Sequence, residues 1–534
     1  MTHWGMVVDL ARCVGCQTCT IACKMENGLP PDTLWRTVLD LESGIFPDVN
    51  RTFFPLTCMQ CAEPPCHDAC PTTATKVRAD GIVWIDNDIC IGCGSCVVAC
   101  PYQARHLVPK EKYYFGEATA PELATYDRER VGICTKCNFC FHKYDNAPEG
   151  VVPGVDPEYT PSCSSSCIAD AIVFGDLADP DSRVSQMVAH SNHSVRLLEH
   201  LGTQPSVHYL NPPRIEAQPP RLQRTWHGLA VTNFFCGTTG PGLYALGILC
   251  AWVEGHTLRP LLNPGDIPGS LQAVLGGAFD TGHLSGLLGP LLVSIGLLAV
   301  AAEAGRPFRG FNVFRNLHHS WMSRESGFAM VFMVLAVLDT LFVAHPALQI
   351  AAVISGLGMT LSQGLILANA KGVPAWNVPR MPRVFITSAL ASGFGAFMVL
   401  EGTFGEIRGF GPIVVGLGLT LASGWNWLHY LRTPPQTATF KRSMAVLRQP
   451  LWQAGILGLG HGIPIVLLIA AWLLPALFTP LLMTAGVALV TGSLIAKYAL
   501  IMRAAFWVDL FDNFPTPQTA PQPVPALATE SAAA

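Results

Sequence analysis

Charged residues are scarce in the second half of this 534-residue sequence, and its first residues carry no export signal. Residues 451–496 contain no Asp, Glu, Lys or Arg, which leaves room for two membrane-spanning helices. The opening residues, MTHWGMVVDLARC, lack a basic segment, an apolar segment, a cleavage site and a twin-arginine pair. We therefore expect that this end of the chain is not exported. Without export, disulfide bonds are not expected, and thiolate ligation of a metal is favoured for the cysteines.

The two halves of the chain differ in charge and in cysteine content. Before residue 214 there are 15 Lys and Arg against 25 Asp and Glu, and from there on 18 against 12. Of the 19 cysteines, 17 lie within residues 13–167. Prolines mark a linker and a tail. We therefore divide the chain into a cysteine domain (1–190), a Pro-rich linker (191–224), a membrane domain (225–510) and a disordered tail (511–534).

Sixteen of the cysteines form four runs. These are Cys13, Cys16, Cys19 and Cys23; Cys58, Cys61, Cys66 and Cys70; Cys90, Cys93, Cys96 and Cys100; and Cys137, Cys140, Cys163 and Cys167. Three closely spaced thiolates suit one iron–sulfur cube, and the fourth cysteine of a run usually completes the other cluster of a pair. The runs therefore predict two pairs of [4Fe–4S] clusters. Structural zinc is the alternative, but it normally draws on two separated pairs of cysteines.

Cys134 makes the fourth run ambiguous. Together with Cys137 and Cys140 it also forms the spacing C-x2-C-x2-C. The spacing alone does not decide whether Cys134 or Cys163 is the ligand.

Residues 1–185 resemble the four-cluster electron-transfer subunits of the molybdopterin oxidoreductases, of the dimethyl sulfoxide, polysulfide and tetrathionate reductase type. The similar stretches are DLARCVGCQTCTIACKMENGLP, CAEPPCHDACPTTAT, DGIVWID, CIGCGSCVVACPYQAR, and KCNFC followed by PGVDPEYTPSC. The resemblance implies an α+β ferredoxin-like domain built from two pseudo-symmetric two-cluster units. It also implies that the first run pairs with the fourth and the second with the third. Cys163 is then the ligand, and Cys134 stays free.

Eight apolar segments follow the linker. Each has the length of about 20 residues that a spanning helix needs, and they are 228–253, 284–303, 327–345, 347–368, 384–401, 409–430, 452–474 and 480–501. A buried core helix is the alternative for any one segment, but eight in succession predict an all-α membrane domain of eight transmembrane helices. Both ends of this domain then lie on the same side.

The basic residues near the helix ends predict the orientation, because Lys- and Arg-rich loops stay cytoplasmic. One side holds Arg214, Arg221, Arg224, Arg306, Arg309, Arg315, Arg324, Lys371, Arg380, Arg383, Arg432, Lys441, Arg442, Arg448, Lys497 and Arg503; the other holds Arg259 and Arg408. We therefore expect a multi-pass protein of the bacterial inner membrane, with the cysteine domain and both termini in the cytoplasm.

The membrane half is also similar to a known family, the eight-helix anchor subunits of the dimethyl sulfoxide reductase type. The similar stretches are EAGRPFRGFNVFRNLHHSWMSRE (303–325) and AKGVPAWNVPRMP (370–382). The resemblance implies that two subunits, separate chains in that family, are fused here. It implies a catalytic partner that holds molybdopterin, as the bis-guanine dinucleotide, and a membrane quinone, either menaquinone or ubiquinone. No nucleic acid is expected as a partner.

Two polar residues near the predicted cytoplasmic helix ends are candidates for quinone binding. Asn233 would hold a carbonyl and Glu303 would exchange the proton; the alternative for Glu303 is an ion pair with Arg306. His429 and His461 raise the question of haem, but they differ in predicted depth by about 12 Å. No haem is therefore expected.

The sequence thus predicts an electron-transfer and membrane-anchor subunit without catalytic residues for an organic substrate. The alternative is a subunit of a hydrogenase-like or proton-translocating quinone complex, which a continuous chain of membrane carboxylates would favour. Asp339 of the third helix is either a group of such a proton path or a satisfied core carboxylate. A cytoplasmic site in the partner would suit sulfite, an aromatic acyl-thioester, an oxyanion or a sulfoxide.

Overall fold

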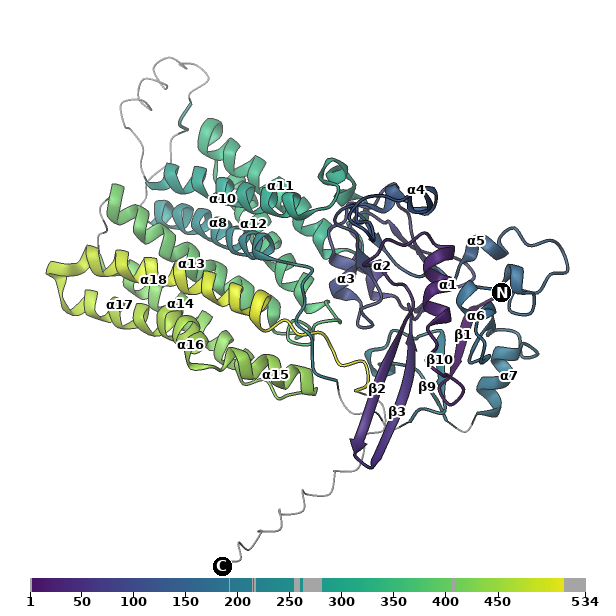
Figure 1. The fold of residues 1–534 in the computed structure, drawn as a ribbon. Helices are drawn as coiled ribbons and strands as arrows, with labels where there is room; N and C mark the ends of the chain where they lie inside the picture. Colours follow the sequence, from purple (N-terminus) through teal and green to yellow (C-terminus); the bar gives the residue numbers. More distant parts are fainter. Residues whose placement is uncertain are drawn as a thin grey trace, which may run out of the picture.

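The computed structural model describes residues 2–191, 193–213, 215, 218–253, 260–262, 281–405, 407 and 409–512. It has two parts, a cysteine domain and a helix bundle, and the cysteine domain lies against one end of the bundle (Figure 1).

A four-stranded sheet organises the cysteine domain, in the order β8-β1-β10-β9. Its central strand β1 (Trp4–Asp9) pairs antiparallel with β8 (Ile172–Asp176) and parallel with β10 (Val207–Leu210), which pairs in turn with β9 (Ser194–Val195). Met6, Val7 and Val8 are fully buried. Because both faces of β1 are covered, this strand is apolar without alternation.

The other elements of the cysteine domain are short, apart from one hairpin. This hairpin joins β2 (Thr37–Ile45) and β3 (Asp48–Leu56), and two smaller pairs join β4 (Thr75–Val77) with β5 (Val83–Ile85) and β6 (His106–Leu107) with β7 (Cys134–Thr135). The helices are α1 (Thr18–Glu26), α2 (Pro65–Asp68), α3 (Ser95–Ala99), α4 (Ala120–Thr125), α5 (Phe141–Tyr144), α6 (Ser162–Ser165) and α7 (Arg183–His190).

The structure differs from the predicted linker in the first half of that segment. β9 and β10 lie beyond residue 190, and Val207 and Tyr209 are fully buried. The prolines of this segment flank β10 instead of interrupting it, so the strand can complete the sheet beside β1. The packed cysteine domain therefore extends to Leu210.

Long helices form the bundle. They are α8 (Gly228–Val253), α10 (Thr281–Glu303), α11 (Trp321–Leu338), α12 (Pro346–Ala368), α13 (Met381–Phe404), α14 (Gly411–Leu431), α17 (Ile463–Leu473) and α18 (Phe478–Tyr498), with the short α15 (Ala438–Leu447) and α16 (Pro450–Gln453) before α17. A π-helical segment, 454–462, connects α16 to α17.

Within the described residues, seven helical segments are long and apolar enough to cross a membrane by length and composition. They are 228–253, 281–303, 321–343, 346–368, 381–404, 450–473 and 475–503. α14 coincides with the predicted span 409–430 but is not among the seven, because its last turns carry Trp425, Asn426 and His429. The predicted count of eight spans therefore stays a prediction.

α8 is the most enclosed of the spanning helices, with 78% of its apolar window buried inside the molecule, against 28% for the segment that begins with α11. Glycines allow its close contact with α13. A Cβ atom on Gly393 would lie 2.2 Å from the carbonyl carbon of Gly242. Helices in a membrane commonly pack through close backbone contacts of this kind, because burial of apolar surface contributes little to helix association inside lipid.

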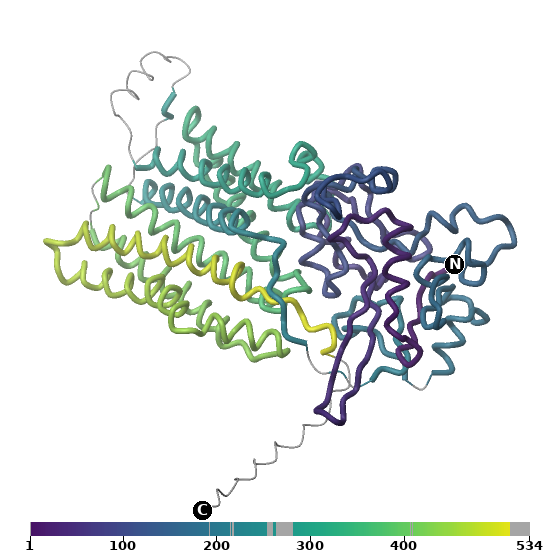
Figure 2. Tube along the Cα trace, in the orientation of Figure 1, coloured from purple at the N-terminus to yellow at the C-terminus, as the bar shows by residue number. Residues whose placement is uncertain are grey.

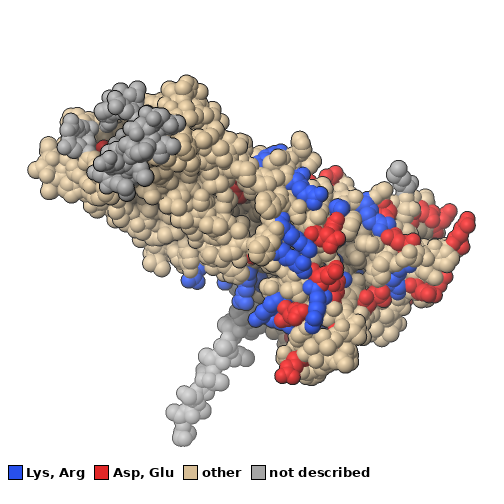
Figure 3. Space-filling model, turned by 90° about the horizontal axis from the view of Figure 1, so that it is seen from above, with Lys and Arg blue, Asp and Glu red and all other residues tan. Residues whose placement is uncertain are grey.

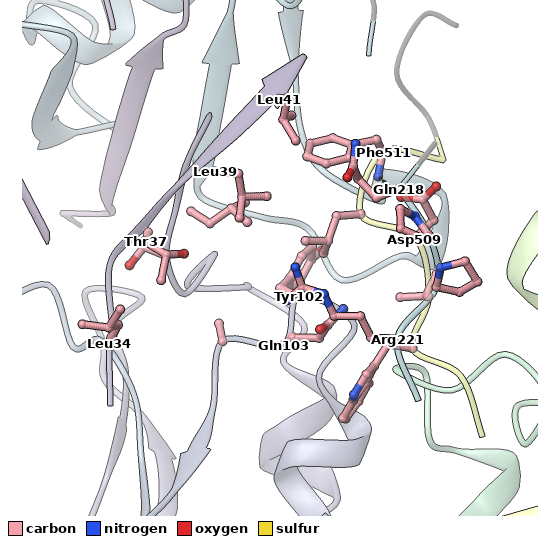
Figure 4. A pocket seen from close by; sticks show the side chains of 18 of the residues that line it. Leu34, Thr37, Leu39, Leu41, Tyr102, Gln103, Gln218, Arg221, Asp509 and Phe511 are labelled. Atoms are coloured by element: carbon pink, nitrogen blue, oxygen red, sulfur yellow. Dashed lines mark hydrogen bonds between the residues drawn. The ribbon is translucent and has the colours of Figure 1, made fainter. Parts of the chain in front are cut away.

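The chain returns to the cysteine domain after the last helix (Figure 2). There the returning segment and the second half of the linker enclose a hollow next to β2 (Figure 4). Phe511 lies edge-on to Phe54, with ring centroids 5.0 Å apart. No cysteine is among the described residues that line this hollow, so it is not one of the candidate metal sites. The described residues end at Asp512, and the predicted disordered tail lies almost wholly beyond them.

Candidate metal centres and the membrane junction

The structure sorts sixteen cysteines into four sets. The distal set is Cys13, Cys16, Cys19 and Cys167, the first inner set is Cys23, Cys137, Cys140 and Cys163, the second inner set is Cys58, Cys61, Cys66 and Cys100, and the junction set is Cys70, Cys90, Cys93 and Cys96. Each set joins three cysteines of one run to one of another. This is the crossed grouping that the resemblance implies; the binding of a cluster by each set stays a prediction.

Left-handed backbone turns bring the cysteines of a run together. In the first run Gly15 and Gln17 have φ values of 70° and 62°, and α1 begins directly afterwards. Cys19 and Cys23 then stand four residues apart on α1, on the same face of the helix. Because they are one turn apart, one helix supplies a thiol to each of two neighbouring sets.

The four sets follow one another from one end of the domain to the bundle. Cys19 of the distal set is an electrostatic neighbour of Cys163 in the first inner set. Cys137 of the first inner set neighbours Cys58 of the second, and Cys66 of the second neighbours Cys96 of the junction set. The order is therefore distal, first inner, second inner and junction.

The geometry of the sets suits a polynuclear group better than a single ion. Among the described residues, no three His, Cys, Asp or Glu side chains converge where they could hold one metal ion. The distal cysteines instead line one common space, and the junction cysteines line another. Burial raises the pKa of the Cys66 and Cys137 thiols. A bound metal group would keep these sulfurs in the thiolate form.

Buried cations give a second indication that the sets hold anionic groups. Arg36, Arg105 and Lys136 are each at most 3% exposed. None of the three has an acidic partner among the ion pairs of the described residues. In this part of the chain, the Nε and Nη1 atoms of Arg36 and the Nε and Nη2 atoms of Arg105 have no hydrogen-bond acceptor. Because a buried charge normally requires a partner, these side chains fit thiolate-bound clusters.

Cys134 lies next to the junction set, away from the set of Cys163. It lines the same space as Cys90 and Cys96. The sequence spacing did not indicate this position. β7, which carries Cys134, pairs with β6, so that Cys134 stands opposite Leu107.

The junction set lies directly under the bundle. The indole Nε1 of Trp226 donates to the carbonyl of Cys93 at 3.1 Å, and the side chain of Asn316 donates to the carbonyl of Cys70 at 2.8 Å. The backbones of the two parts approach each other more closely still at Gly305, because glycine has no Cβ atom. A Cβ on Gly305 would lie 2.2 Å from the carbonyl oxygen of Gly132. The side chain of Trp226 also stacks on Trp376 within one continuous apolar cluster that joins the two parts.

The structure places the two predicted quinone residues in different surroundings. Glu303 accepts a hydrogen bond from the backbone N–H of His227 at 2.7 Å, just before α8 begins. Asn233 is buried inside the bundle and donates to Glu325 Oε1 at 3.0 Å. Gln363 donates to the same oxygen at 2.8 Å. Asn233 and Glu303 therefore have different hydrogen-bond partners, and their binding of a quinone stays a prediction.

Glu325 was not singled out from the sequence. The predicted third span began at residue 327, which left Glu325 in a loop, whereas α11 begins at Trp321. Ser320, a residue type favoured at the start of a helix, was a signal for a start at Trp321. Asn233 and Gln363 donate to Glu325 through their side-chain nitrogens. Their side-chain oxygens, Asn233 Oδ1 and Gln363 Oε1, are buried without a hydrogen-bond partner among the described residues.

A cavity lies between the cysteine domain and the adjacent ends of α11 and α12. Its walls are Glu63, Pro65, Asp68, Ala69, Ser95, Val98, Ala99, Gly202, His318, His319, Ser320, Trp321, Met322, Ile366, Asn369, Ala370 and Lys371. Ala69 and Ser95 are sequence neighbours of the junction cysteines Cys70 and Cys96. The cavity therefore combines apolar helix ends, basic side chains and closeness to the junction set.

The histidines considered for haem have protein partners in the structure. Nδ1 of His461 lies 2.7 Å from the carbonyl of Ile456, and its Nε2 lies 3.0 Å from Ser423 Oγ. Nδ1 of His429 lies 3.1 Å from the carbonyl of Trp425. The two histidines lie on different helical segments, each with its own partners.

Comparison with known proteins agrees with an iron–sulfur electron-transfer protein. Residues 49–115 match the family described as a 4Fe-4S dicluster domain. The chain is 41% identical over 224 residues to a selenate reductase subunit of Mesobacillus selenatarsenatis. This match covers 39% of this chain and 72% of that protein. It is 37% identical to the iron-sulfur cluster-binding subunit of menaquinone reductase of Nitratidesulfovibrio vulgaris (39% and 88% covered) and 36% identical to a polysulfide reductase component of Wolinella succinogenes (38% and 92% covered). This protein belongs to the same family of iron–sulfur reductase subunits.

Proposed function

We propose that this chain carries electrons between a catalytic molybdopterin subunit and a membrane quinone, and that its helices anchor the complex. The observation that carries the proposal is the order of the four cysteine sets, which leads from the exposed Cys16 to the carbonyls bound by Trp226 and Asn316. When bound, a [4Fe–4S] cluster in each set takes up and releases one electron at a time. The protein's own part is to hold these groups in line and to exclude water from the inner sets.

The distal set is our proposed contact with the catalytic subunit. Cys16 is exposed, and the nearby side chains of Val14, Ile21 and Ile168 are 58%, 58% and 74% exposed. Apolar side chains around an exposed metal-binding loop are typical of a surface that another protein covers.

The proposed cytoplasmic orientation is supported by where the basic residues lie. The face of the bundle in Figure 3 is almost free of charge, and Lys and Arg gather where it meets the cysteine domain. Arg306 and Arg309 donate there to carbonyls of Val131 and Asn87. Since basic loops stay in the cytoplasm, the cysteine domain would lie on that side of the bacterial inner membrane.

We propose the cavity next to Trp321 as the place of the quinone headgroup. It adjoins the junction set through Ala69 and Ser95, while Met322 and Ile366 supply apolar walls from α11 and α12. An electron carrier must approach its membrane partner closely, and this cavity lies between the junction set and the helix ends. Among the comparisons, the name of the menaquinone reductase subunit supports a quinone.

Glu325 is the proposed group for proton exchange. It lies three residues after Met322 on α11, and its partner Gln363 lies three residues before Ile366 on α12, so both are one turn deeper than the cavity. Asn233 then orients Glu325, and Glu303 caps α8 through His227. Direct binding of the quinone by Asn233 and Glu303, as the sequence predicts, remains the rival proposal.

Quinol-driven reduction of the clusters in lipid vesicles tests these assignments, with dithionite reduction of the same sample as the measure of intact clusters. We expect Trp321→Ala, His319→Leu and Glu325→Gln to slow the quinol reaction about tenfold, or about 1.4 kcal/mol in the barrier. Glu303→Gln is expected to change it little. Slowing by Glu303→Gln and Asn233→Leu alone would favour the rival site. Absence of a molybdopterin protein from the purified complex would contradict the proposed function itself.

No observation in the described residues favours the proton-translocating alternative. Glu325 and Asp339 stand at opposite ends of the α11 segment, and Ala329, Phe332 and Ala336 between them are fully buried apolar side chains. Proton release into inverted vesicles during turnover would reinstate that alternative.

A further inference from the structure

Three buried cations occupy the cysteine domain at its three boundaries between neighbouring sets. Arg36 Nη2 lies 3.4 Å from Cys163 Sγ, and its other electrostatic neighbours include Cys19. Arg36 therefore lies between the distal set and the first inner set.

Lys136 occupies the next boundary. Its Nζ donates to the carbonyl of Cys137 at 2.6 Å and also to that of Val83. Its charge acts on Cys137 of the first inner set and on Cys66 of the second.

Arg105 occupies the third boundary. Its Nη1 donates to Thr75 Oγ1 at 3.0 Å, and its charge acts on Cys96 of the junction set. Cys66 and Cys58 of the second inner set are also among its electrostatic neighbours. Each of the three boundaries thus contains one buried cation.

We propose that Arg36, Lys136 and Arg105 are shared counter-charges, each of which raises the reduction potentials of the two clusters on either side of it. The proposal rests on the proposed binding of one cluster by each set. Reduction adds one negative charge to a cluster, and a nearby positive charge stabilises that reduced form. The cations themselves gain and lose no proton in this process. They act by their charge alone.

Burial of the three side chains makes this effect larger than it would be at the surface. Arg36, Lys136 and Arg105 are 1%, 3% and 3% exposed, so solvent screens their charge little. Distance limits the effect to adjacent clusters. Each cation therefore acts on its own pair of neighbouring clusters, and each of the two inner clusters belongs to two of these pairs.

Redox titration of the purified complex, followed by electron paramagnetic resonance, tests the proposal. The variants are Arg36→Met, Lys136→Met and Arg105→Met, with Arg36→Lys, Lys136→Arg and Arg105→Lys as controls that keep the charge. Signals are assigned beforehand with Cys→Ser variants at Cys16, Cys140, Cys61 and Cys93, one for each set. Iron content is measured for every variant.

Each methionine variant should lower the potentials of two clusters and leave the other two unchanged. At a fixed potential, the ratio of reduced to oxidised cluster should fall about tenfold for each affected cluster, which is about 59 mV for a one-electron couple. The affected pair should be distal and first inner for Arg36, the two inner clusters for Lys136, and second inner and junction for Arg105. The charge-keeping variants should stay near the native values.

A uniform shift of all four clusters, a shift in one cluster alone, or no shift would overturn the proposal. Loss of iron in both variants at one position would show that the side chain serves packing, and would overturn the proposal for that boundary. Because these readouts are potentials, they are separate from the quinone reaction: a failed quinone assignment leaves the pairwise pattern intact.

Discussion

The distal set and the junction set have the same cysteine spacing and contrasting surroundings. Cys16 of the distal set is exposed, whereas the junction cysteines Cys70, Cys90 and Cys96 are buried beneath the bundle. Surface ion pairs surround the distal set, where Asp170 bonds to both Arg12 and Arg183. Backbone carbonyls bound by bundle side chains surround the junction set. One local motif thus serves two different contacts, and its environment decides which.

The largest expected effect is the loss of a whole cluster. It tests which cysteine completes the first inner set, which follows the distal set in the order of the four sets. Cys163→Ser should lose or convert the cluster of the first inner set. Cys134→Ser should keep about sixteen iron atoms per chain. The physical reason is that Cys163 completes a crossed set, whereas Cys134 is a fifth thiol next to the junction set. Iron analysis and electron paramagnetic resonance measure both. The reverse result would mean that the ligand is Cys134.

A second prediction concerns the side of the membrane on which the cysteine domain lies, with both its distal set and its junction set. Reporter fusions after Arg315, Lys371 and Arg442 should read as cytoplasmic, because these loops are basic. A fusion near Asp266, which lies outside the described residues, should read as periplasmic. A periplasmic signal from the amino terminus would contradict both the orientation and the choice of cytoplasmic substrates.

A third prediction sharpens the contrast between the exposed and the covered set. Val14→Asp and Ile168→Asp should each weaken binding of the catalytic subunit about tenfold, because a charge would be buried in the contact, and about 1.4 kcal/mol corresponds to tenfold in the dissociation constant. Leu123→Asp, at an exposed position on α4, is the matched control and should change binding little. Titration of the catalytic partner against this protein, with iron content unchanged, measures the effect. Equal effects at all three positions would place the contact elsewhere.

The smallest expected effect concerns the ion pairs around the distal set. Hydrogen bonds from Arg183, and the charge of Arg12, lower the pKa of Asp170. A carboxylate with a lowered pKa in the folded state stabilises the protein above its unfolded pKa, and this contribution disappears as the pH falls through the folded value. Asp170→Asn should therefore cost at most about 1 kcal/mol near neutral pH, since the pair is exposed. Denaturant unfolding at neutral and acid pH should show the difference shrink in acid; a difference that grows in acid would contradict the ion pair.

Local spacing was sufficient for part of the molecule. The four runs indicated four cysteine sets, and a dicluster family match confirms the iron–sulfur character of residues 49–115. Hydropathy indicated the helices, and seven helical segments of the described residues have the length and composition of a membrane span. Both signals work from the sequence because they depend on neighbours within a few turns: a thiol's place in a run, or an unbroken apolar stretch.

Tertiary structure decided what depends on residues far apart in the chain. β10 joins β1 from the other end of the cysteine domain's sequence, which turned part of the predicted linker into a strand. Cys134 lies next to Cys90, which is distant from it in the chain, and Glu325 is joined to Asn233 and Gln363 because three helices meet. The burial of Arg36 and Arg105 was also beyond the sequence, since arginine normally lies at the surface. The sequence by itself determined which groups are present and how each run folds locally; the long-range packing decided which of them share a site, because burial and partnership arise only when distant segments meet.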